Sequence, residues 1–275
     1  MQKDQIDMYV SRRIYWPAYT WPTQTNYSNI IDNKESEILD KYKWKNKEEL
    51  KKQISDLFDK LNATFYHLQQ LKSAEKKAIK IGSELVKIAI PGFEKAIGVV
   101  GSPYEPIQYE YEALLISAKT TLDLLVFIVG KSLGKNTKRI NLVSFYHELN
   151  QGNSTGIEIK FKTVLNKFSD FIKTFSRDIS WRNYAVHKGS LSTGTINIPV
   201  NNPKASILKF KALNPYEDDS KQARKLHEVE NLDNFCEDIF YSMSDIVIES
   251  LEILLDSSFE KGVKMSVQEK MINSN

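Results

Sequence analysis

The sequence predicts an all-α helical bundle with a small β-hairpin insertion and an N-terminal aromatic arm. Over most of the chain, apolar residues recur every three or four positions, which is typical of helices that bury one face. Residues 193–213 instead alternate apolar and polar residues around a turn, which indicates a hairpin. Residues 1–34 hold closely spaced aromatics without a helical period, and Pro17 and Pro22 oppose a helix there.

Length and composition are those of an ordinary globular protein. The chain has 275 residues, 41% of them hydrophobic and 27% charged. Its 38 basic and 35 acidic residues leave a net charge of +3, so a nucleic-acid surface requires local clustering. The single cysteine, Cys236, excludes an internal disulfide and favours a reducing compartment. The polar N-terminus predicts no secretory signal, so we expect a cytoplasmic protein.

We expect two parts, an arm over residues 1–34 and a single helical domain over residues 35–275. The aromatic segment at residues 15–22 of the arm has two interpretations. Its rings either pack onto the domain or contact a partner protein or nucleic-acid bases.

The domain is predicted to begin with two helices, over residues 36–71 and 73–90. Inward positions of the first helix recur at helical spacing, at Leu50, Ile54, Leu57, Leu61, Phe65 and Leu68. Seven lysines between Lys51 and Lys80 face three acidic residues, a pattern that most often marks a solvated helix face.

A third helix is predicted to lie at the centre of the bundle. It starts between residue 102 and a position a few residues later, and it ends near residue 133. It is apolar on almost all sides, and its inward stripe is Tyr111, Leu114 or Leu115, Ala118, Leu122, Leu125 and Val129. Lys119 and Asp123 within it favour a buried core helix over a membrane span.

The remaining helices are predicted at residues 140–149, from residue 157 onward without a break, and near 232–254. The inward residues of the last helix are Leu232, Phe235, Ile239, Met243, Ile246 or Val247, Leu251 and Leu254. Residues 151–156 and 214–229 have the composition of loops.

Several common types of site are excluded by their spacing. None of the four histidines has another histidine or a cysteine at a metal-ligand spacing, so we expect neither a zinc site nor a cofactor. Cys236 lies within an amphipathic pattern, which indicates a buried apolar role. Glu110 and Glu112 are two residues apart and do not share a helix face, which weakens a paired-carboxylate interpretation.

Polar groups suited to phosphate chemistry are concentrated in residues 180–189, SWRNYAVHKG, near the end of a predicted helix. Arg182 and His187 are five residues apart, so one copy of the helix points them in different directions. A second copy related by a two-fold axis would bring one chain's arginine near the other chain's histidine. Between residues 157 and 190, seven basic residues face three acidic residues.

These residue types suit RNA cleavage without a metal ion. A histidine exchanges protons near neutral pH, and an arginine binds phosphate and the charge that develops on it. Asn183 offers an amide that orients the histidine or binds an oxygen. RNA supplies its own nucleophile, the 2′-hydroxyl. Lys188 and Tyr184 are candidate substrate-binding residues, although Tyr184, like Trp181, also suits a packing role.

An arginine followed by asparagine, with a histidine four to six positions after the arginine at the end of a bundle helix, resembles the HEPN family. The resemblance covers residues of about 100–257 and assigns Arg182, Asn183 and His187 to a catalytic cluster. It implies a homodimeric, metal-independent ribonuclease of toxin–antitoxin or antiviral systems. An acidic residue on an earlier helix also joins the site in some members, and Glu110, Glu112 and Asp123 are the candidates here.

Two other interpretations are open. Some HEPN proteins are noncatalytic assembly or sensor subunits that bind a partner protein or a nucleotide. In the plainest interpretation, His187 and Lys188 only end a helix before Gly189, and Arg182 is a surface ion-pair partner. For the ribonuclease, we expect RNA, a second copy of the chain and an antitoxin or defence-complex protein as partners, and no membrane.

Overall fold

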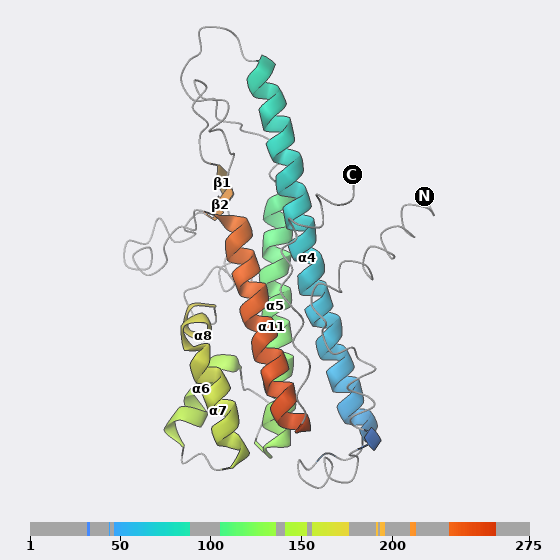
Figure 1. Ribbon diagram of the computed structural model, residues 1–275, viewed down its shortest axis with the longest axis vertical. Helices are drawn as coiled ribbons and strands as arrows, with labels where there is room; N and C mark the ends of the chain where they lie inside the picture. The colour runs from blue at the N-terminus through green and yellow to red at the C-terminus, as the bar shows by residue number, and fades with distance from the viewer. Residues whose placement is uncertain are drawn as a thin grey trace.

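In the part of the chain that the computed structural model describes, three long helices lie side by side and three short ones pack beside them (Figure 1). The described residues are 32–33, 44, 47–88, 105–135, 141–152, 156–175, 191, 193–195, 210–212 and 231–256. The helices are α4 (Lys47–Ile88), α5 (Glu105–Ser132), α6 (Leu142–Gln151), α7 (Ile157–Lys167), α8 (Ser169–Phe175) and α11 (Leu232–Leu255). Two short strands are β1 (Thr193–Thr195) and β2 (Phe210–Ala212). The all-α prediction is therefore confirmed for the described residues.

Helix α4 is one continuous helix of 42 residues, whereas the sequence predicted two helices divided after residue 71. That prediction was wrong because Glu75 interrupts the apolar pattern. In the structure Glu75 occupies an inward position between Leu71 and Ala78, both of which are buried, so the buried stripe continues. No proline or glycine interrupts the helix before Gly82. The predicted start near residue 36 lies outside the described residues.

Helix α5 is central, as the sequence predicted. Helix α4 packs along one side of it and α11 along another (Figure 1). The predicted inward residues are all buried: Tyr111, Leu114, Leu115, Ala118, Leu122, Leu125 and Val129. Glu49 near the start of α4 pairs with Lys131 near the end of α5, while His67 pairs with Glu110. The two helices therefore run antiparallel.

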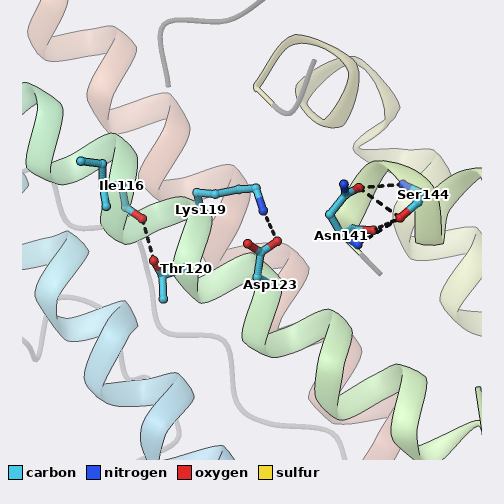
Figure 2. A network of polar contacts seen from close by, with 6 residues as sticks. All are labelled: Ile116, Lys119, Thr120, Asp123, Asn141 and Ser144. Carbon is cyan, nitrogen blue, oxygen red and sulfur yellow. Dashed lines mark hydrogen bonds and ion pairs between the residues drawn. The ribbon is translucent and has the colours of Figure 1, made fainter. Parts of the chain in front are cut away.

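Among the described helices, α5 is the one long and apolar enough to cross a membrane. Within its most apolar window, 67% of the residues are buried against the rest of the protein, as in a core helix of a bundle. The Lys119 side chain is largely buried and pairs with Asp123 one turn further along the helix (Figure 2). The helix begins at Glu105, and Pro106 is tolerated because residues in the first turn donate no intrahelical hydrogen bond.

The short helices differ from the prediction at one point. The sequence predicted an unbroken helix from residue 157, but α7 ends at Lys167 and α8 begins at Ser169. The backbone of Phe168 leaves helical geometry, and its N–H donates to the carbonyl of Leu165, only three residues back, at 3.2 Å. The apolar period of the sequence runs through Phe168 and does not reveal this break. Helix α6 starts at a capping box between Asn141 and Ser144 (Figure 2).

Helix α11 follows its prediction closely. Its inward stripe is buried, except that Phe235 is only partly buried. The Asn231 side chain caps the first turn by accepting from the N–H of Asn234 at 3.1 Å. Asp256 ends the helix in the left-handed conformation with φ of 46°.

The two strands lie at the ends of the predicted hairpin insertion. They pair antiparallel, with Thr193 opposite Ala212 and Thr195 opposite Phe210. Residues 196–209 lie outside the described residues, so the complete hairpin remains a prediction. The aromatic arm also lies outside them except at residues 32–33, where Asp32 pairs with Lys51 of α4 at 2.6 Å.

Candidate functional site

The predicted catalytic cluster lies outside the described residues. Arg182, Asn183 and His187, with the candidate substrate-binding residues Tyr184 and Lys188, belong to the segment between α8 and residue 191. The structure therefore tests neither their geometry nor their pairing with a second copy. What it does describe is the chain on either side of the segment.

The segment is followed by a firmly held residue, Leu191. Its side chain is fully buried in the hydrophobic core. Its backbone N–H donates a hydrogen bond to Oε1 of Glu112 on α5, over a distance of 2.6 Å. A charged acceptor makes such a bond stronger than one between neutral groups. The chain is thus fixed to the first third of α5 four residues after His187.

The three acidic residues that the sequence left open have different partners. Oε2 of Glu110 lies 2.7 Å from Nδ1 of His67 on α4, whereas Asp123 pairs with Lys119 of its own helix. Glu112 is the candidate that contacts a described residue next to the predicted cluster. Because Glu110 and Glu112 are two residues apart, they point to different sides of α5, as the sequence indicated.

The pair of His67 and Glu110 was not foreseen from the sequence. An ionised carboxylate only accepts hydrogen bonds, so with Glu110 ionised the proton of the imidazole lies on Nδ1. This arrangement orients the ring and leaves Nε2 as its second hydrogen-bonding atom. The two residues are 43 positions apart, and no local pattern connects them.

A partly buried polar cluster joins α4 and α11 beside α5. Lys72 pairs with Glu237 and lies 3.6 Å from Asp233. Glu75 Oε1, Tyr111 Oη and Asp233 Oδ1 are buried and have no hydrogen-bond partner in the described part of the structure. The sequence predicted Tyr111 inward but not the burial of Glu75, because an isolated glutamate in a lysine-rich helix reads as a surface residue.

Burial in this cluster shifts several protonation equilibria. Loss of hydration, reinforced by the charge of Asp233, raises the pKa of Glu75 from 4.5 to about 8. Burial likewise raises the pKa of Asp233, and it raises the pKa of the Cys236 thiol well above its ordinary value. Glu75 is therefore mostly protonated and uncharged at neutral pH. The buried position of Cys236 agrees with the apolar role predicted for it.

Within the described ranges, no three His, Cys, Asp or Glu side chains are grouped so that they would hold a metal ion. Comparison of the chain with protein-family models, with curated proteins and with solved structures found no match. The assignment of a function therefore depends on the residues of the 180–189 segment and on the geometry around Glu112.

Proposed function

We propose that this protein is a metal-independent endoribonuclease of the HEPN type that acts as a cytoplasmic homodimer in a toxin or antiviral-defence system. The observation that carries the proposal is the arginine, asparagine and histidine of residues 182–187, followed by a residue that Glu112 binds to the central helix. Four residues of extended chain reach at most about 14 Å, which keeps His187 within reach of the surroundings of Glu112.

In the proposed reaction, the RNA 2′-hydroxyl attacks the adjacent phosphorus. The new bond joins O2′ to phosphorus, and the bond from phosphorus to O5′ breaks. His187 acts either as general base, taking the 2′-hydroxyl proton, or as general acid, giving a proton to the leaving 5′-oxygen, and water exchanges the other proton. Arg182 binds the phosphate and the charge that accumulates on it, while Asn183 orients the histidine. Lys188 and Tyr184 contact the flanking RNA, and the products are a 2′,3′-cyclic phosphate and a 5′-hydroxyl.

The first experiment is cleavage of RNA by the purified protein in excess chelator. Arg182→Ala and His187→Ala should each reduce the rate at least a hundredfold, because each removes a group that acts in the transition state. His147→Ala, at an exposed position on α6, is the matched control and should leave the rate unchanged. Activity that requires a divalent metal ion, or that survives both motif variants, would exclude the mechanism.

A second experiment tests the shared site. Mixing Arg182→Ala protein with His187→Ala protein produces heterodimers in which one of the two composite sites has both intact residues. Random exchange of subunits should therefore restore about a quarter of the wild-type rate. If each chain holds a complete site, the mixture stays inactive.

The alternative is a noncatalytic subunit that binds a partner protein or a nucleotide. It predicts no cleavage under any condition and no toxicity when the protein is expressed. Growth inhibition that His187→Ala relieves would decide against it.

A further inference from the structure

The lysines of α4 differ in their ion-pair partners, which the sequence did not show. In the first half of the helix, Lys47 and Lys51 pair with Asp32, and Lys52 pairs with Asp56. Lys76, Lys77 and Lys80 near the other end are exposed and form no ion pair with any side chain that the structure describes. We call these three residues the lysine surface.

The lysine surface occupies one face of the helix. Positions 76, 77 and 80 lie within an arc of about 100° around the helix axis. Buried Leu71 and Ala78 lie on the opposite face. Three ammonium groups are therefore presented together to solvent.

Carboxylates whose side chains the structure describes do not offset this charge, and Glu84, four residues after Lys80, lies outside those side chains. Glu75 is the only acidic residue between positions 60 and 83, and it is buried. Because burial raises the pKa of Glu75 to about 8, it adds little negative charge at neutral pH. Asp233 and Glu237 of α11 face Lys72, one turn before the lysine surface.

The lysine surface and Leu191, the described residue that follows the 180–189 segment, lie toward the same end of the bundle. The Lys72–Glu237 pair places this part of α4 beside the start of α11, and Glu112 holds Leu191 in the first third of α5. Beyond that level, α4 continues past the starts of α5 and α11 (Figure 1).

The lysine surface lies further along α4 than the His67–Glu110 pair. His67 is level with Glu110, and the lysines follow it by nine to thirteen residues. At 1.5 Å per residue, that is about 14–20 Å along the helix. One phosphate group does not extend over this distance, so the surroundings of Glu110 and the lysine surface would contact different nucleotides of one bound RNA.

We propose that Lys76, Lys77 and Lys80 bind the phosphate backbone of the substrate RNA outside the cleavage site. The proposal rests on the ribonuclease function for the identity of its ligand. A cluster of unpaired cations suits a polyanion because binding releases the counterions of the phosphates. The lysine surface then increases affinity for long RNA without taking part in the chemical step.

The test compares a Lys76→Gln, Lys77→Gln, Lys80→Gln variant with a charge-matched Lys47→Gln, Lys52→Gln, Lys60→Gln variant in the first half of α4. Binding of single-stranded RNA is measured at 50 to 200 mM salt, with His187→Ala in every protein to prevent cleavage. Loss of three phosphate contacts should reduce the slope of log K against log salt by about 2 and weaken binding at least tenfold at low salt. The matched variant should behave like the parent protein.

Cleavage measurements separate this proposal from the proposed function. In the proteins with intact His187, the lysine-surface variant should raise KM for long RNA at least tenfold, with kcat and the cleavage of a dinucleotide unchanged. If the lysine-surface variant has the same RNA affinity and salt slope as the matched variant, RNA binding by the lysine surface is refuted, even if the protein cleaves RNA. Binding that depends on the three lysines without any cleavage would uphold it and refute the ribonuclease instead.

Discussion

Oε1 of Glu112 on the central helix accepts the backbone N–H of Leu191 at 2.6 Å, although the two residues are 79 positions apart. This bond fixes the chain directly after the segment that carries Arg182 and His187. Because it holds the chain next to the candidate segment, we expect changes at Glu112 to alter stability and, under the proposed function, activity.

Glu112→Ala should lower the free energy of unfolding by about 2 kcal/mol, because it removes a charged acceptor from a partly buried N–H group. Glu112→Gln keeps an acceptor oxygen and should lower the free energy of unfolding by about half as much. Urea denaturation measures both values. Asp238→Ala, at an exposed position on α11, is the control and should stay within about 0.5 kcal/mol of the wild type. Under the proposed function, Glu112→Ala should also slow RNA cleavage, and an unchanged rate would remove Glu112 from the site.

Glu75 should make the protein less stable as the pH rises from about 4.5 to about 8. Its pKa is higher in the folded state, so folding takes up a proton in this window and stability decreases with increasing pH. Glu75→Gln should be a few kcal/mol more stable than the wild type at pH 8, with the difference vanishing near pH 4.5. Thermal unfolding across this pH range measures the effect, and Asp59→Asn at an exposed position of the same helix is the control. Parallel stability curves for wild type and Glu75→Gln would contradict the shifted pKa.

Ser132→Ala should destabilise the protein by about 1–3 kcal/mol. Ser132 Oγ accepts the indole N–H of buried Trp44 at 2.8 Å, and the change leaves that group without this partner. A double-mutant cycle with Trp44→Phe isolates the bond, because the phenyl ring has no donor. The coupling should be at least about 0.5 kcal/mol. Strictly additive effects would show that the bond does not contribute to stability.

The Cys236 thiol should react with a thiol reagent only as fast as the protein opens. The side chain is fully buried, and its raised pKa suppresses the reactive thiolate. Ser73→Cys, at an exposed position of α4, provides a second thiol that should react immediately in the same sample. Rapid labelling of two thiols in this variant would contradict the buried position of Cys236.

Helical periodicity predicted the described core well and its interruptions poorly. The inward stripe of α5 was correct residue by residue, because a helix that is apolar on nearly all sides has few alternative arrangements. The division of α4 was wrong because Glu75 is polar at a core position. The break at Phe168 was missed because an aromatic residue fits the apolar period whether or not the helix continues.

By itself, the sequence determined the positions of most described helices, the apolar character of Cys236 and the residue types on which the ribonuclease proposal depends. These properties follow from local spacing, which each segment carries independently of its neighbours. Only the tertiary structure decided that Glu112 binds Leu191, the described residue next to the 180–189 segment. It likewise decided that Glu75 is buried and that Lys76, Lys77 and Lys80 pair with no described side chain, because burial and partners depend on helices distant in sequence packing together.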